Sequence, residues 1–283
     1  MLIIGEKING TRKRVKQAVM DRDADFIKNL ATSQVEAGAE MLDINAGTTT
    51  DREPEDLIWL IQTVQEVVDK PLCLDSPNPA ALAAGITVTK QTPMINSISA
   101  EPYRLTGILP LVAQHGCRVI ALAMESNKIP NTSEGRMAIV RRLFEETRKA
   151  GIPDENMYVD ALVMSVATDG NACITTLETM RTILKEFPKS HLAAGLSNVS
   201  FGLPARALVN RAFMTLALEA GLDSAIMDPN ERGLMETLLA SNVLLGRDKH
   251  CMQYNRAFRA GKIGPAQEEK KLSAPELSPV TVG

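Results

Sequence analysis

The segment Leu72-Cys73-Leu74-Asp75 carries the pattern that decides the fold, a short apolar strand that ends in a polar side chain. The same pattern recurs in Met94-Ile95-Asn96, Tyr158-Val159-Asp160 and Leu196-Ser197-Asn198. In a parallel α/β protein the carboxyl ends of the strands converge on one face, where ligands bind. We therefore expect two carboxylates and two amides around one site. Such a set suits a neutral, nitrogen-rich heterocycle and does not suit a phosphate.

Apolar segments of this kind alternate with amphipathic helices along the chain. Most are apolar throughout, as is typical of parallel strands that are covered on both faces. Glycine can end a helix in the left-handed conformation, and it stands just before a predicted strand at Gly38, Gly116, Gly151 and Gly221. The predicted strands are Leu2–Ile8, Met41–Asn45, Leu72–Asp75, Met94–Ser97, Arg118–Met124, Met157–Leu162, Leu192–Asn198 and Ser224–Asp228.

Eight such βα units, each of roughly 30 residues, predict an α/β fold of the closed (β/α)8 TIM-barrel type with right-handed crossovers. The alternative is a doubly wound open sheet, which usually has a glycine-rich phosphate-binding turn after its first strand. We expect one barrel domain over residues 1–262. Residues 263–283 are charged and then rich in Ser and Pro, which predicts a disordered tail.

Composition argues against several classes of function. The formal net charge is only −3 and aromatic residues make up 4% of the chain, so neither nucleic acid nor a membrane surface is expected as a partner. No segment approaches the length of a membrane span. Four scattered cysteines without a signal-peptide pattern predict a protein of the reducing cytoplasm. The chain has no clustered Cys and His residues, so no bound metal is expected.

Each polar strand end has a structural alternative to a role in ligand binding. Asp75 could cap the helix that follows it, and Asp160 has the same choice, although no clear helix starts just after it. Asn96 could satisfy amide groups of its loop. Asn198 lies in a run of small polar residues, which lets the backbone approach a ligand closely.

The first two predicted strands add further polar groups to the same rim. Glu6 and Asn9 lie at the end of the first strand, and Asp43 and Asn45 lie at the end of the second. Glu6 and Asp43 are either ligand contacts or partners of cations such as Lys7, and the sequence does not decide between these two interpretations.

Several segments together carry a family resemblance. They are Leu2-Ile3-Ile4-Gly5-Glu6-Lys7-Ile8-Asn9-Gly10, Leu72-Cys73-Leu74-Asp75-Ser76, Met94-Ile95-Asn96-Ser97, Gly195-Leu196-Ser197-Asn198-Val199-Ser200-Phe201-Gly202, Asn210-Arg211-Ala212-Phe213 and Ala225-Ile226-Met227-Asp228. These motifs resemble those of the pterin-binding methyltransferases. The family includes the acetogen methyltetrahydrofolate:corrinoid/iron–sulfur protein methyltransferase and the folate module of cobalamin-dependent methionine synthase. The resemblance covers nearly all of the chain up to residue 260.

The resemblance implies a barrel like that of dihydropteroate synthase, usually a homodimer, with tetrahydrofolate or 5-methyltetrahydrofolate as substrate. By position, Asp75, Asn96 and Asp160 match the residues that hydrogen-bond the pterin ring. Asn198 matches the mobile asparagine that reaches pterin N5. The chain departs from the family pattern at Ala161, where proline is expected, and this change is expected to loosen the local backbone while leaving the carboxylate in place. The long tail is a second departure.

The activity that the resemblance implies is methyl transfer between folate N5 and the cobalt of a corrinoid. The chain has no Asp-x-His-x-x-Gly corrinoid-binding pattern, so the corrinoid is expected on a separate protein. Asp75, Asp160 and Asn198 are the candidate catalytic residues, because carboxylates can polarise the pterin and an amide can donate a hydrogen bond that strengthens in the transition state.

Two other functions are compatible with a pterin pocket. A condensing enzyme like dihydropteroate synthase would need a cationic pyrophosphate site near the ends of the last two strands. A non-catalytic folate-binding protein would need only the pocket. The residues do not show the direction of methyl transfer. The enzyme could methylate a corrinoid from methyltetrahydrofolate, as in carbon fixation, but the family resemblance favours methylation of tetrahydrofolate within an O-demethylase or betaine demethylase system.

Overall fold

The computed structural model describes residues 1–126 and 128–265. The chain divides into two compact units, Met1–Asn230 and Glu231–Gly283. The described part of the second unit holds helix α10, a short 3-10 turn η3 and helix α11, with bounds Arg232–Leu244, Lys249–Cys251 and Met252–Arg259.

The predicted tail lies outside the described residues from 266 onward. The extension of the barrel domain to residue 262 stays a prediction. Among the residues that the structure describes, no helix is long and apolar enough to cross a membrane.

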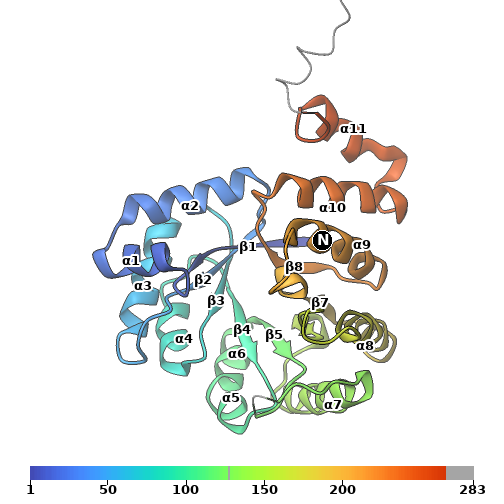
Figure 1. Cartoon of the computed structure of the whole chain (residues 1–283). Coiled ribbons are helices and arrows are strands. Elements are labelled where there is room, and N and C mark those ends of the chain that lie inside the picture. Colours follow the sequence, from blue (N-terminus) through green and yellow to red (C-terminus); the bar gives the residue numbers. More distant parts are fainter. Residues whose placement is uncertain (127, 266–283) are drawn as a thin grey trace, which may run out of the picture. The chain divides into compact units, whose positions relative to one another are not determined.

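All eight strands lie in the first unit and form one parallel sheet at its centre (Figure 1). Their order in the sheet is β7-β6-β5-β4-β3-β2-β1-β8, so each strand lies beside its neighbour in sequence. The strands are β1 Leu2–Asn9, β2 Met41–Asn45, β3 Leu72–Asp75, β4 Met94–Ile98, β5 Arg118–Leu122, β6 Met157–Asp160, β7 His191–Ala193 and β8 Ser224–Met227. The prediction of eight parallel strands is confirmed.

The two outer strands, β7 and β8, bring the sheet close to a full circle. The amide of Ile226 donates to the carbonyl of Ala194 at 2.9 Å, and the hydroxyl of Ser224 donates to the carbonyl of Leu192 at 2.8 Å. A single parallel bridge joins Gly195 to Ile226. The fold is therefore the predicted (β/α)8 barrel, nearly closed, and the open-sheet alternative is wrong.

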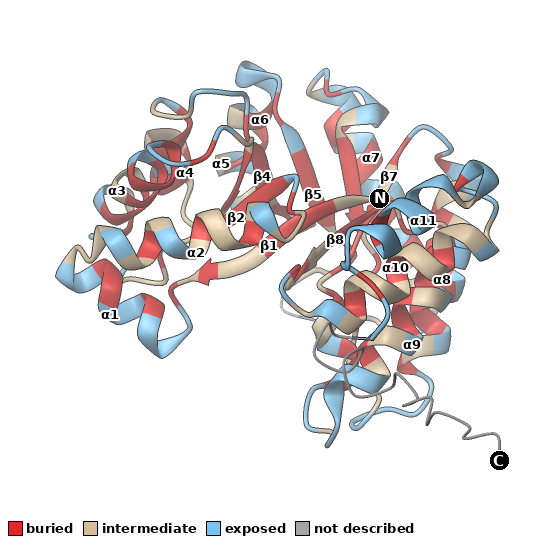
Figure 2. Cartoon of the chain, turned by 90° about the horizontal axis from the view of Figure 1, so that it is seen from above, coloured by how far each residue is buried: buried red, intermediate tan, exposed pale blue. Residues whose placement is uncertain are grey.

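Within the described residues of the first unit, nine α-helices follow the strands in sequence. Their bounds are α1 Lys13–Asp21, α2 Ala24–Glu36, α3 Glu53–Gln65, α4 Pro79–Ile86, α5 Pro102–Gly107, α6 Leu109–His115, α7 Ser133–Lys149, α8 Ala172–Glu186 and α9 Arg206–Glu219. In this unit, buried residues fill the strands and one side of the helices, while exposed residues line the opposite side (Figure 2). This division follows from their amphipathic sequences.

Local signals set where several helices begin and end. The Asp23 side chain accepts the amide of Phe26 at 3.1 Å and caps α2. Thr132 caps α7 by accepting the amide of Gly135 at 3.2 Å. The glycines predicted at helix–strand junctions all have positive φ, as at Gly116 (62°) and Gly221 (102°).

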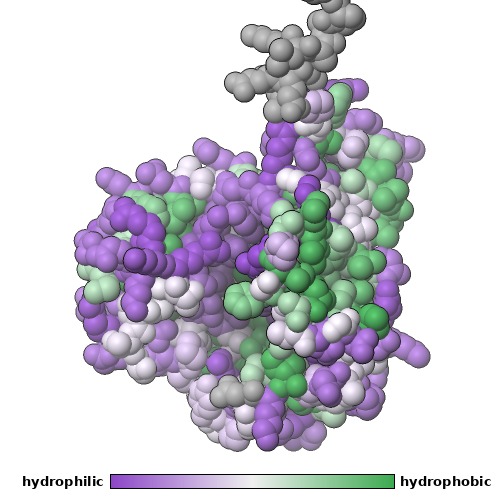
Figure 3. Space-filling model, viewed as in Figure 1, coloured by the Kyte–Doolittle hydropathy of each residue, from purple (hydrophilic) through white to green (hydrophobic). Residues whose placement is uncertain are grey.

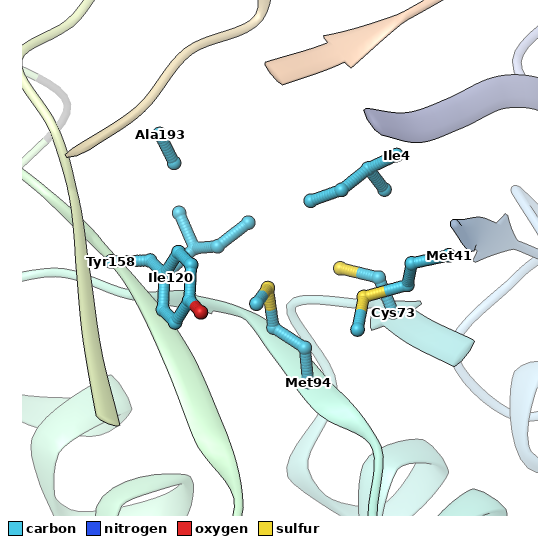
Figure 4. Packing of buried hydrophobic residues seen from close by; sticks show 7 residues of the cluster. All are labelled: Ile4, Met41, Cys73, Met94, Ile120, Tyr158 and Ala193. Atoms are coloured by element: carbon cyan, nitrogen blue, oxygen red, sulfur yellow. The ribbon is translucent and has the colours of Figure 1, made fainter. Parts of the chain in front are cut away.

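Inside the barrel, a layer of apolar side chains from seven strands packs together (Figure 4). Its members are Ile4, Met41, Cys73, Met94, Ile120, Tyr158 and Ala193. Figure 4 shows these side chains converging from their strands on a common centre. The barrel interior is therefore a packed core at this level and provides a dry floor for whatever lies above it.

Candidate active site

A polar layer lies directly beyond the apolar layer, toward the carboxyl ends of the strands. Side chains alternate across a strand, so a residue two places after an apolar-layer member lies on the same side of the sheet. Two places beyond Ile4, Met41, Cys73, Met94 and Tyr158 stand Glu6, Asp43, Asp75, Asn96 and Asp160. The structure thus brings together the polar strand ends predicted from the sequence.

Two acidic members of this layer, Asp43 and Asp75, accept hydrogen bonds from side-chain amides. Asn45 Nδ2 donates to Asp75 Oδ2 at 2.9 Å, and Asn96 Nδ2 donates to Asp43 Oδ1 at 3.2 Å. Asp43 is only 2% exposed, whereas Asp75, Asn96 and Asn45 are half-buried. The Oδ1 atom of Asn45 is buried and has no hydrogen-bond partner among the described residues.

Burial and mutual repulsion change the acidity of the carboxyl groups. Loss of water raises the pKa of Asp43 well above its usual range, and the negative charge of Asp75 raises it further. The pKa of Asp75 is also raised by burial, but the amide of Asn45 and the charge of Arg104 act in the opposite direction. Burial and the neighbouring charge therefore favour the protonated form of Asp43 more strongly than that of Asp75.

Asp160 lies at the end of β6, and the residues in register with it on β5 and β7, Leu122 and Ala193, are uncharged. Its Oδ1 accepts the amide of Leu162 at 2.7 Å, and the amide of Gly195 also donates to its carboxylate. Desolvation raises the pKa of Asp160 to about 6, although these hydrogen bonds act to lower it. A proton on this group therefore exchanges near neutral pH.

Asn198 is where the structure corrects the sequence interpretation. β7 ends at Ala193, and Asn198 lies instead in the 3-10 helix η2, Leu196–Ser200. The run of small polar residues after Gly195 forms a short 3-10 turn of the kind that commonly serves as a connector. Asn198 is exposed, and its side-chain amide has no hydrogen-bond partner among the described residues.

Gly195 links Asn198 to the polar layer. A Cβ atom on Gly195 would lie 3.0 Å from Asn198 Nδ2, so the amide lies against this glycine. Gly195 also donates its backbone amide to Asp160. Asn198 and Asp160 therefore share a neighbour, and the free amide is placed at the edge of the acid–amide layer.

Polar residues at the end of β1 form ion pairs or cap a turn. Glu6 Oε1 pairs with Arg12 Nη2 at 2.7 Å, and Lys7 Nζ pairs with Asp228 Oδ2 at 2.6 Å. Burial raises the pKa of Glu6, which the Arg12 charge partly offsets. Asn9 Oδ1 accepts the amide of Thr11 at 2.9 Å and its hydroxyl at 2.7 Å, so this side chain fixes its own loop.

The alternatives left open by the sequence are resolved in part. Asp75 does not cap the next helix, because Asn78 does so by accepting the amide of Ala80 at 3.0 Å. Glu6 is the partner of a cation, although that cation is Arg12 and not Lys7. The basic α1 helix forms part of a hydrophilic surface of the first unit (Figure 3).

Sequence reasoning missed Arg136, a buried cation next to Asp160. Its position was signalled by the periodicity of α7, since Arg136 stands four and seven residues before the buried Val140 and Leu143. A charged residue on an apolar stripe is rarely buried without specific partners. No signal in the sequence pointed to the pairing of Lys7 with Asp228.

A barrel with this acid–amide floor defines a pterin-binding protein, and the chain belongs to that family. The family of pterin binding enzymes matches residues 5–228, which include all the predicted site residues. The chain is 40% identical over 269 residues to methylcorrinoid:tetrahydrofolate methyltransferase of Eubacterium limosum, covering 94% of this chain and 99% of that protein. It is 31% identical over 243 residues to methionine synthase of Mycobacterium tuberculosis, covering 80% of this chain but 20% of that protein.

Solved structures share the fold at lower identity. Dihydropteroate synthase from Xanthomonas albilineans in complex with 7,8-dihydropteroate has a TM-score of 0.64 at 17% identity, covering 86% of this chain and 92% of that one. The Coxiella burnetii enzyme in complex with pteroic acid has a TM-score of 0.62 at 15% identity, with the same coverage. These similarities confirm the predicted dihydropteroate-synthase-like barrel.

Proposed function

We propose that this protein transfers the methyl group of a methylcorrinoid, carried by a separate protein, to N5 of tetrahydrofolate. The observation that carries the proposal is the arrangement of Asp75, Asn96 and Asp160 on one desolvated layer, with the unpartnered amide of Asn198 at its edge. The near full-length similarity to the Eubacterium limosum enzyme supports both the reaction and its direction.

The acid–amide layer supplies the groups that a pterin ring requires. Asp75 and Asp160 accept hydrogen bonds from ring N–H groups. Asn96 has its Nδ2 committed to Asp43, so its Oδ1 is the atom available to a ring donor. These contacts fix the ring and leave N5 facing Asn198.

The reaction forms an N5–carbon bond from the N5 lone pair, while the carbon–cobalt electron pair stays on cobalt as Co(I). N5 then loses to water the proton that it carried. The oxygen of Asn198 can accept the N5–H before transfer, and its Nδ2 can donate to N5 in the reverse reaction. A neutral amide serves both directions without becoming charged.

A condensing enzyme is the weaker candidate. Its pyrophosphate product would need free cationic groups near the ends of the last two strands. At the end of β8 stands Asp228, which is bound by Lys7 at 2.6 Å. After β7, the guanidinium of Arg206 donates to the Ser197 carbonyl and the Ser200 hydroxyl. The acid–amide layer carries carboxylates, which repel a pyrophosphate.

Anaerobic spectrophotometry tests the proposal. Methylated corrinoid protein is mixed with tetrahydrofolate and this enzyme, and we expect the Co(I) absorption band to rise. Asn198→Ala should slow this reaction by roughly one to three orders of magnitude, as for loss of a preorganised donor, with little change in folate affinity.

Gln17→Ala, which removes an exposed amide from α1, is the matched control and should leave the rate unchanged. Equal turnover of Asn198→Ala and the native protein would remove Asn198 from the mechanism. Folate binding without any methyl transfer would favour the binding-only alternative, and formation of a pteroate from a pterin pyrophosphate would favour the condensing enzyme.

We further propose that the enzyme is a cytoplasmic homodimer. Its four cysteines are free, which suits a reducing compartment. Ile174 of α8 and Leu208 and Leu216 of α9 are exposed apolar side chains that a subunit interface would cover. Sedimentation equilibrium tests the dimer, and a monomer at micromolar concentration would contradict it.

A further inference from the structure

Arg136 is a buried cation whose hydrogen bonds go mainly to main-chain carbonyls. It lies in the first turn of α7 and is 2% exposed. Its Nη1 donates to the carbonyls of Ala161 at 2.7 Å and Leu162 at 2.9 Å and to the hydroxyl of Thr176 at 3.1 Å. Its Nε donates to the carbonyl of Pro130 at 2.9 Å.

Two of these carbonyls belong to the residues directly after Asp160. Leu162 has a positive φ of 65°, a conformation that an ordinary side chain adopts only when its surroundings hold it there. In this conformation the Leu162 amide points back to Asp160 Oδ1 at 2.7 Å. Arg136 therefore holds the backbone turn that in turn holds the Asp160 carboxylate.

The charge of Arg136 also acts on Asp160. Within residues 1–126 and 128–265, Arg136 forms no ion pair, and the carboxylates that act on its charge are those of Asp160 and Asp169. A buried cation without a close counter-ion is unfavourable for stability, so the presence of Arg136 at this position calls for another explanation. Leu122 and Ala193, in register with Asp160 on the adjacent strands, carry no charge, so Arg136 is the cation that opposes desolvation of this carboxylate.

We infer that Arg136 is a positioning residue for Asp160, which orients the carboxylate through the Ala161–Leu162 turn and favours its ionised form. The catalytic role in this inference rests on the proposed function, whereas the contacts of Arg136 are those of the ligand-free protein. The guanidinium accounts for the order of this turn although Ala161 stands where proline was expected, because it holds the Ala161 carbonyl directly.

Titration of Asp160 in the ligand-free protein tests this inference without any substrate. The 13C carboxyl resonance of Asp160, assigned by its loss in Asp160→Asn, is followed against pH in the native protein and three variants. Arg136→Gln should raise the titration midpoint by about one pH unit or more, because an opposite charge is lost. Arg136→Lys should leave the midpoint near the native value, because the charge remains.

Thr176→Val is the matched control. It removes a hydroxyl that accepts from the guanidinium and donates to the Leu162 carbonyl at 3.0 Å, but it keeps the charge of Arg136, so its midpoint should not move. An Arg136→Gln protein that folds, by circular dichroism, and titrates at the native midpoint would overturn the inference.

If Arg136→Gln does not fold, Arg136→Lys decides the matter through turnover. Lys has a single donor nitrogen and cannot reach both the Pro130 carbonyl, as Nε does, and the carbonyls after Asp160, as Nη1 does, so kcat should fall at least tenfold while the midpoint stays unchanged. Native kcat in Arg136→Lys would overturn the positioning role. Failure of the proposed function is distinguished from these outcomes, because the native protein would then show the Asp160 titration but no methyl transfer.

Discussion

Replacing Asp160 by asparagine should stabilise the folded protein at alkaline pH while removing its function. Burial raises the pKa of this carboxyl from 3.8 to about 6, so its ionised form is disfavoured in the folded state. That increase corresponds to a loss of up to about 3 kcal/mol above pH 6, at 1.36 kcal/mol per pH unit. Asparagine resembles the protonated carboxyl in shape and can still accept the Leu162 amide, so the variant avoids this loss.

The stability gained by Asp160→Asn should depend on pH. Because the folded pKa is raised, the folded protein binds the proton more tightly than the unfolded chain between pH 4 and 6, and stability falls as pH rises through that window. The advantage of Asp160→Asn should therefore be greatest at pH 8 and vanish near pH 4. Urea unfolding followed by circular dichroism measures it, and a variant no more stable than the native protein at pH 8, or an advantage independent of pH, would refute the reasoning.

Two other substitutions test the neighbouring groups. Gly195→Ala keeps an ordinary backbone conformation (φ −74°) but places its Cβ 3.0 Å from Asn198 Nδ2. We therefore expect kcat to fall severalfold, with folate affinity and melting temperature nearly unchanged. An unchanged kcat would contradict the placement of the Asn198 side-chain amide beside Gly195. Asp43→Asn keeps an acceptor for the Asn96 amide and removes a charge that burial and Asp75 disfavour, so the free energy of unfolding at pH 7 should change by less than about 1 kcal/mol. A loss above about 2 kcal/mol would mean that Asp43 is ionised and that its charge matters.

The sequence was sufficient to predict the barrel and most of its polar layer because both depend on simple periodicity. The strand end at Asp75 was placed correctly, as was the convergence of Asp75, Asn96 and Asp160 on one face. These predictions required only that parallel strands end on the same side and that side chains alternate along each strand.

The parts that could not be predicted depend on contacts between distant residues. The sequence does not distinguish a strand end from a 3-10 turn at Asn198, because a short apolar run followed by small polar residues is compatible with both. The pairing of Lys7 with Asp228 joins the first and last strands and exists only once the barrel closes. Arg136 likewise acquires its role only when α7 packs beside the end of β6.

The presence of amides among the acids of the polar layer follows from what lies beneath it. The apolar layer of the barrel removes water from one side of every group above it, so a ring made only of ionised carboxylates would repel itself in a poorly solvated space. Amides from Asn45 and Asn96 relieve this by donating to Asp75 and Asp43, and the raised pKa of Asp43 disfavours a second charge beside Asp75. What remains is a floor with few charges and many acceptors, which matches the N–H groups of a neutral pterin and excludes an anion of the same size.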